Sequence, residues 1–156
     1  MHPNAALLEG FYASFGRLDA EAMAKCYHRD VTFRDPVFGE LRGQRAGDMW
    51  RMLAGRAKDF AVEASEVKAD DARGSARWVA TYTFGKTGRR VRNVIDARFE
   101  FRDGLILRHE DAFDLWKWAG QALGPTGLLL GWTPLVQGRI RDEARKGLDA
   151  FVAGRR

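Results

Sequence analysis

The chain has 156 residues, a formal charge of +5 and a pI of about 9.7. This length predicts one domain with a single core, and the 46% of hydrophobic residues excludes a disordered chain. Cations and anions are interleaved along the sequence, so despite the basic pI we expect no nucleic-acid partner. The single cysteine, Cys26, excludes an internal disulfide and favours a cytoplasmic location, and no apolar run is long enough for a membrane span.

The first third of the chain has mainly helical spacing. Leu8, Phe11, Tyr12 and Phe15 recur at i, i+3, i+4 and i+7, which predicts a helix with one apolar face. Asp19 is a suitable N-cap for a second helix. The predicted elements that follow are helices over residues 20–28 and 46–58, with a short strand over 30–33 and a loop over 34–43 between them.

The second half of the chain begins with strands, because the hydrophobic period changes from 3.6 to 2 near residue 61. Short turns between successive strands favour antiparallel pairs. We therefore expect an α+β fold, in which a cone-shaped, curved, mainly antiparallel sheet wraps around the N-terminal helices and leaves an apolar pocket. The predicted strands cover residues 60–67, 75–84, 89–101 and 105–114, and further helices cover 113–123 and most of 134–153.

The two C-terminal helices extend beyond the predicted cone. We expect residues 1–123 to form the cone domain and residues 124–156 to form a C-terminal helical extension of the same domain. The extension is rich in leucine and tryptophan, so it needs a surface to cover it. It can act as a lid over the cone, pack on the outside of the sheet or form a dimer interface. A lid or a swapped dimer element is favoured, because the expected outer sheet face is charged.

Two segments, residues 18–43 and 96–116, resemble the SnoaL-like and ketosteroid isomerase-like superfamily, which has the nuclear transport factor two-like fold. The resemblance covers roughly residues 5–118 and implies the cone fold. It does not imply one activity, because the superfamily contains isomerases, cyclases, hydrolases and non-catalytic scaffolds.

The resemblance to ketosteroid isomerases implies a catalytic role for Asp35, since it matches the proton-abstracting aspartate of their Asp-Pro-Val segment. Their catalytic tyrosine corresponds to Phe11, which has no hydroxyl group, although Tyr12 is adjacent. Their protonated aspartate corresponds to Asp96, but the alternation of its strand points Asp96 away from the core. A steroid isomerase is therefore not expected.

The last predicted strand has a polar pair on its apolar face. Leu105, Leu107 and Phe113 mark the inner face, so His109 and Asp111 are expected to point into the cone. The superfamily's cyclases and epoxide hydrolases have a catalytic carboxylate near this place, which Asp111 matches. The hydrolases' arginine and aspartate on an earlier strand have no match in residues 75–84, so epoxide hydrolysis by that mechanism is not expected.

These observations predict a small-molecule pocket protein in which Asp111, His109 and Asp35 are the candidate catalytic residues, with Asp111 favoured as the base. The expected chemistry is cofactor-free acid–base catalysis (isomerisation, cyclisation, dehydration or hydrolysis) on an apolar oxygenated substrate. The alternatives are purely structural: His109 and Asp111 can be a buried polar pair satisfied by the backbone, and Asp35 can form an Asx-turn. The expected pocket residues, each of which can also be simple packing, are Tyr12, Phe38, Trp50, Trp78, Tyr82 and Phe113.

The partner predictions complete this interpretation. The three histidines have no metal-ligand spacing, and no phosphate-binding loop occurs, so we predict neither a metal nor a cofactor. The expected ligand is small and apolar or aromatic, and we expect a homodimer. The alternatives are a non-catalytic binding protein for a lipid-like or aromatic ligand, and a dimeric association module.

Overall fold

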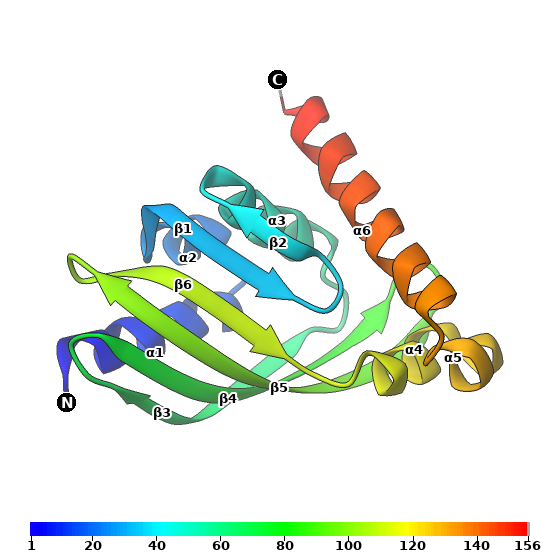
Figure 1. The fold of residues 1–156 in the computed structure, drawn as a ribbon, viewed down its shortest axis with the longest axis horizontal. Helices are drawn as coiled ribbons and strands as arrows, with labels where there is room; N and C mark the ends of the chain where they lie inside the picture. Colours follow the sequence, from blue (N-terminus) through cyan, green and yellow to red (C-terminus); the bar gives the residue numbers. More distant parts are fainter. Residues whose placement is uncertain (156) are drawn as a thin grey trace.

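The computed structural model describes residues 1–155 (Figure 1), and Arg156, the last residue of the expected extension, lies outside the described residues. The helices are α1 (Pro3–Gly16), α2 (Ala20–Lys25), α3 (Gln44–Arg56), α4 (Leu115–Leu123), α5 (Pro125–Leu130) and α6 (Pro134–Gly154). The strands are β1 (Tyr27–Asp35), β2 (Gly39–Arg42), β3 (Ala61–Ala69), β4 (Arg73–Phe84), β5 (Arg89–Arg102) and β6 (Leu105–Ala112).

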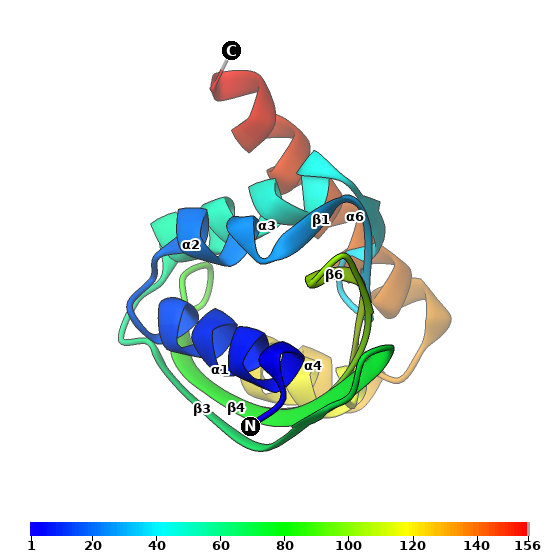
Figure 2. The same cartoon turned by 90° about the vertical axis from the view of Figure 1, so that its left-hand side faces the viewer.

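The strands form one curved sheet in the order β2-β1-β6-β5-β4-β3. Neighbouring strands are antiparallel except β1 and β6, which are parallel. Seen from the end in Figure 2, the sheet curves around α1, while α2 and α3 cover the opposite side. The predicted α+β cone with a mainly antiparallel sheet is therefore confirmed.

The core lies between α1 and the inner face of the sheet. The predicted helical stripe of Leu8, Phe11, Tyr12 and Phe15 is buried along its whole length. On β5, every second residue from Val91 onward is buried and the residues between them are exposed. These two periodicities meet face to face, so the helix and the sheet exclude water from a single apolar cluster.

The predicted boundaries of the first strand are wrong. Tyr27, expected on the second helix, begins β1, and the strand runs to Asp35. The expected loop over residues 34–43 contains β2, which pairs with the end of β1. Long-range pairing with β6 and β2 overrides the local pattern, because it satisfies backbone groups that a helix end or a loop would leave to solvent.

The predicted inner face of the last strand is correct for His109 and Asp111 but wrong at its start. Ile106 is fully buried, whereas Leu105 and Leu107 are only half-buried. A shift in the β5–β6 register next to Phe101 reverses the alternation at this point.

The C-terminal helices cover one end of the cone. Helix α4 packs on β5 through Leu115 and Trp118, and Ile140 of α6 adds to the same cluster. Further along α6, Leu148 is fully buried in the main core. Among the described residues, no helix is both long and apolar enough to cross a membrane.

Helix α6 also holds the loop that follows β1. Arg141 donates a hydrogen bond to the carbonyl oxygen of Pro36 at 3.2 Å, and Arg145 donates to that of Phe38 at 2.6 Å. The helix is tied to α3 by an ion pair between Arg45 and Asp149 at 2.9 Å. These contacts place α6 against the segment that carries Asp35.

We predict that Leu148→Ala lowers the free energy of unfolding by about 2–4 kcal/mol, because it leaves a cavity in the main core. Urea denaturation followed by circular dichroism measures the loss. The control Leu135→Ala, on the same helix at 79% exposure, should change stability by less than about 0.5 kcal/mol. Equal small effects of both variants would contradict the packing of α6 on the core.

Candidate functional site

His109 and Asp111 form a hydrogen-bonded pair inside the cone. Both lie on the inner face of β6, where His109 is fully buried and Asp111 is 6% exposed. The Nε2 atom of His109 lies 2.8 Å from Oδ1 of Asp111. The same oxygen accepts a hydrogen bond from the indole of Trp78 at 3.2 Å. Two residues that are two positions apart on one strand therefore meet side by side, as the alternation predicted.

Tyr27 completes a chain of hydrogen bonds on the other side of the imidazole. Its hydroxyl accepts a hydrogen bond from Nε1 of Trp50 at 2.8 Å and lies 2.8 Å from Nδ1 of His109. If Tyr27 donates to Nδ1, then Nε2 carries the proton and donates to Asp111. This assignment gives every member of the chain a partner, so it fixes the imidazole in one orientation and one tautomer.

Tyr12 lies beside this chain with its hydroxyl group unused. The side chain is 4% exposed, and the hydroxyl oxygen is the one buried side-chain polar atom in the described chain without a hydrogen-bond partner. Burial, followed by the negative charge of Asp111, raises the pKa of Tyr12 well above its ordinary value. The hydroxyl therefore stays protonated, and an unpartnered buried donor of this kind suits a ligand oxygen.

Asp35 lies at the end of β1. One of its carboxylate oxygens is hydrogen-bonded, and the other has no hydrogen-bond partner within residues 1–155. Its Oδ1 accepts hydrogen bonds from the backbone N–H groups of Val37 at 3.0 Å and Phe38 at 2.6 Å, which is the expected Asx-turn. Burial raises the pKa of Asp35 to about 7, with a smaller contribution from the charge of Asp111. The two carboxyl groups thus lie within electrostatic reach of each other.

The expected pocket residues fall into two groups. Trp50 and Trp78 donate to the central hydrogen-bond chain and pack with Tyr12 against the core. Phe113 and Tyr82 contact both the main core and the α4 cluster, and Tyr82 accepts a hydrogen bond from Trp118 at 2.7 Å. Phe38 is buried in the main core beside Asp35.

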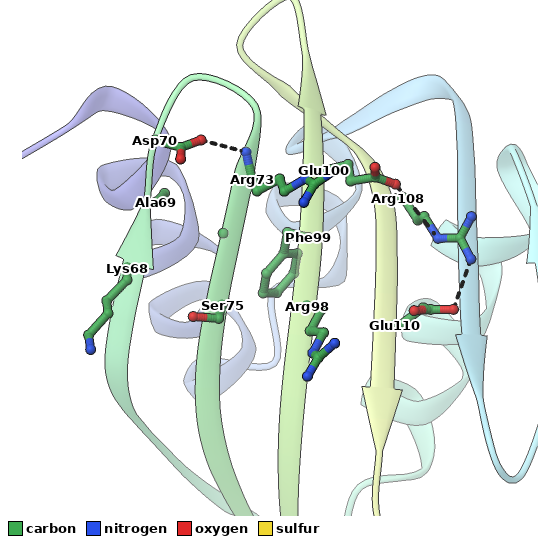
Figure 3. Close-up of a pocket in the computed structure, with 11 residues that line it drawn as sticks. Lys68, Ala69, Asp70, Arg73, Ser75, Arg98, Phe99, Glu100, Arg108 and Glu110 are labelled. Carbon is green, nitrogen blue, oxygen red and sulfur yellow. Dashed lines mark hydrogen bonds and ion pairs between the residues drawn. The ribbon is translucent and has the colours of Figure 1, made fainter.

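A hollow of about 860 Å³ lies elsewhere, on the outer face of the sheet (Figure 3). Its charged lining includes Arg98, Glu100, Arg108 and Glu110 from β5 and β6, and Arg108 pairs with both glutamates. Asp96 also faces outward from β5 and pairs with Arg77 at 3.0 Å. The outer face is therefore a network of exposed ion pairs, and the predicted outward direction of Asp96 is confirmed.

Sequence reasoning missed Tyr27. Phe11, at the position that corresponds to the superfamily's catalytic tyrosine, packs edge-on against the His109 ring at 5.7 Å between ring centroids. The hydroxyl group that reaches His109 comes instead from Tyr27, on a different element. No local signal marks it, because the register of β1 against β6 shifts between Tyr27 and Thr32.

The site contains acid–base groups in an apolar surrounding. Within residues 1–155, no group of three or more histidine, cysteine, aspartate or glutamate side chains lies close enough together to hold a metal ion. The available groups are a near-neutral carboxyl group, an oriented imidazole–carboxylate pair and an unpartnered phenol. Such a set can move a proton and stabilise charge on a substrate oxygen.

Residues 8–109 match the family model described as the SnoaL-like domain. A comparison with curated protein sequences finds no match. Three solved structures share the fold at low sequence identity, and at these identities the likeness extends to the fold alone.

The first is an LEH-like epoxide hydrolase from M. tuberculosis, at 23% identity and a TM-score of 0.66, covering 83% of this chain and 96% of that chain. The second is a protein with a ketosteroid isomerase-like fold from Catenulispora acidiphila, in complex with trimethylamine. Its sequence identity is 14% and its TM-score 0.68, and the match covers 82% of this chain and 97% of that chain. The third is a putative polyketide cyclase from Xanthomonas campestris pv. campestris. Its sequence identity is 21% and its TM-score 0.64, and the match covers 76% of this chain and 96% of that chain.

We predict opposite effects of removing two buried hydroxyl groups. Tyr27→Phe should cost about 2–4 kcal/mol of unfolding free energy, because it leaves the indole N–H of Trp50 and the Nδ1 atom of His109 without a partner. Tyr12→Phe should not lower the unfolding free energy and can raise it by up to about 1 kcal/mol, because the Tyr12 hydroxyl has no partner to lose. Paired urea titrations measure both values, and a larger loss for Tyr12→Phe would contradict this hydrogen-bond chain.

The raised pKa of Asp35 predicts a specific pH dependence of stability. Its pKa is about 7 in the fold against an ordinary value of 3.8, so between these values the folded protein holds a proton that the unfolded chain releases. Stability should therefore fall as the pH rises from about 4 to 7, by at most about 4 kcal/mol. Asp35→Asn keeps an oxygen for the Asx-turn and removes the titration.

Urea denaturation at pH 5 and pH 8 tests this prediction. The variant Asp35→Asn should gain stability relative to the unmodified protein at pH 8 but not at pH 5. Asp96→Asn, at an exposed carboxylate on the outer face, serves as the control and should keep the original slope. An identical pH slope for Asp35→Asn and the unmodified protein would show that Asp35 titrates normally.

Proposed function

The chain belongs to the SnoaL-like domain family, and from this premise we propose that it is a small-molecule enzyme that catalyses cofactor-free proton transfer on an apolar, oxygenated substrate. One arrangement carries the proposal. A buried, oriented His109–Asp111 pair lies beside the unpartnered hydroxyl group of Tyr12, within electrostatic reach of a carboxyl group, Asp35, that titrates near neutral pH.

Asp35 is the proton-transfer group in this proposal. A general base works best when its pKa is near the working pH, and that of Asp35 is about 7. Its Oδ1 is held by two backbone N–H groups, whereas Oδ2 takes part in none of the described hydrogen bonds. The sequence favoured Asp111 as the base, but Oδ1 of Asp111 already serves both His109 and Trp78. Asp35 is therefore the freer carboxylate.

The other groups stabilise the charge that forms. When the Asp35 carboxylate removes a proton from a carbon next to a carbonyl group, the electron pair moves to the carbonyl oxygen. The Tyr12 hydroxyl donates a hydrogen bond to that oxygen, and the His109–Asp111 pair holds the polar end of the site in place. Protonated Asp35 then returns its proton to the substrate at the same or another carbon. Isomerisation, aldol-type cyclisation and dehydration all begin with this step.

The inner face of β4 favours this chemistry over epoxide hydrolysis. Its inward residues are Ala76, Trp78 and Ala80, so β4 supplies no arginine or aspartate to the interior. Solved structures of the same fold include both an epoxide hydrolase and a putative polyketide cyclase. Of these two reactions, carbonyl chemistry fits the residues of this chain better.

Substrate reaches the site past Tyr82 and Phe113, and α6 acts as a lid on this path. The helix holds the backbone of residues 36–38 through Arg141 and Arg145, directly after Asp35. A movement of α6 therefore changes both the opening and the segment that orients the base. Residues 124–156 serve in this proposal as a lid-forming extension of the domain formed by residues 1–123.

A second candidate function is non-catalytic binding of a lipid-like or aromatic ligand. One observation favours it: both ring nitrogens of His109 and one oxygen of Asp111 are already bonded to protein groups. A pocket whose polar groups are satisfied internally can hold an apolar ligand without chemistry.

Exchange of α-protons in the aromatic ketone α-tetralone tests the proposal. In D₂O near neutral pH, the protein should accelerate loss of the α-proton NMR signal relative to buffer. Asp35→Asn should lower the protein-dependent rate by about 10²-fold or more, since it removes the general base. Tyr12→Phe should lower it by about tenfold or more, since it removes a donor to the oxyanion.

Asp96→Asn is the matched control, because it changes an exposed carboxylate outside the cone and should leave the exchange rate unchanged. Binding of α-tetralone is followed in parallel by quenching of tryptophan fluorescence. Binding without exchange in the unmodified protein would reject the proton-transfer function and support the binding protein.

A further inference from the structure

Helix α5 and the residues after it form an exposed apolar projection at one corner of the molecule. We define the apolar tip as Leu128, Leu129, Leu130 and Trp132, with side chains that are 49–69% exposed. Leu135 at the start of α6 is also exposed, as is Trp116 of α4, whose indole N–H contacts Leu128. Figure 1 shows α5 packed next to α4, at the end of the molecule away from the N-terminus.

The tip is held rigidly by backbone contact between helices. A Cβ atom at Gly127 would collide with the carbonyl oxygen of Ala119, so α5 lies directly against α4. The indole N–H groups of Trp116 and Trp132 donate to the carbonyl oxygens of Leu128 and Leu129 at 2.9 and 3.0 Å. Because these polar atoms are already satisfied, the exposed part of each indole is mainly its apolar ring.

The shape of the tip decides which kind of partner covers it. Leu128, Leu129 and Leu130 are consecutive on a helix, so their side chains point in directions about 100° apart. A flat protein surface covers only one of these directions. A fluid apolar phase surrounds a projecting helical turn on all sides, as the acyl boundary of a membrane does.

Cations outnumber anions around the tip, although Lys86 pairs with Glu143 at 3.8 Å. Residues 85–92 and 115–141 together contain seven lysines and arginines and no aspartate or glutamate, whereas the rest of the chain has 19 cations and 21 anions. Hydrogen bonds join the two segments, including one from Arg89 to the carbonyl oxygen of Gln121 at 2.9 Å. A surface hollow of about 670 Å³ has three cations and one anion in its lining, together with Trp116 and Leu128. The charged residues are Arg89, Arg90, Lys117 and Asp114.

We propose that the apolar tip inserts into the interfacial layer of an anionic membrane while the surrounding cations contact the lipid headgroups. Leucine side chains with indole rings and flanking lysine and arginine are the combination that interfacial insertion uses. The excess of cations that makes the protein basic lies on the two segments around the tip, where these cations would contact the anionic headgroups.

Co-sedimentation with lipid vesicles tests this proposal on the full chain. The protein should bind phosphatidylcholine vesicles that contain about 30% phosphatidylglycerol, bind pure phosphatidylcholine vesicles at least about tenfold more weakly, and release as salt is raised. Leu129→Ser should reduce the partition coefficient by about tenfold or more. Val94→Ser removes an exposed apolar side chain from β5, away from the tip, and is the matched control.

A charge reversal examines the cationic surface separately. Lys117→Glu should weaken binding to the anionic vesicles several-fold, whereas Arg29→Glu, at an exposed site on β1, should have a clearly smaller effect. Failure of the unmodified protein to bind anionic vesicles, or full binding by Leu129→Ser, overturns the proposal. If binding fails and Leu129→Ser lowers the sedimentation coefficient in the absence of lipid, a second copy of the chain covers the tip instead.

Discussion

The hydroxyl group of Tyr27 is the point on which the interior of this protein depends. It joins Trp50 of α3 to His109 of β6, and all three residues are buried. A buried imidazole needs a partner for each ring nitrogen, and the two partners here come from β1 and from β6 itself. The first strand of the sheet is thereby fixed against the last, and both are fixed against α3.

The parallel pairing of β1 and β6 follows the same constraint. These strands are far apart in sequence, and their pairing brings Phe33 beside His109 in the register of the sheet. The helix-to-strand boundary at Tyr27 exists because this pairing and the hydroxyl contact stabilise an extended backbone there. One side of the cone is thus closed by long-range contacts, while the other side is built by a simple meander of neighbouring strands.

The C-terminal helices combine two roles that oppose each other physically. One face of α6 buries Leu148 in the core, while the α5 corner displays leucine and tryptophan side chains to solvent. The segment between them is held by glycine-mediated contact rather than by an apolar core of its own. The same extension therefore contacts the loop after Asp35 and leaves an apolar surface exposed at the α5 corner.

The hydrophobic pattern of the chain is enough to predict the α+β cone, the apolar stripe of α1, the outward face of Asp96 and the inward direction of His109 and Asp111. Each of these follows from a period of 3.6 or 2 that is repeated over several residues, and such a period is a local property. Three features emerge only from the packing of the whole fold: Tyr27 belongs to β1, Tyr12 has an unpartnered hydroxyl group, and burial raises the pKa of Asp35 to about 7. The hydrogen-bond partners and the burial of a side chain depend on which distant segments pack together, and no periodicity within one segment contains that information.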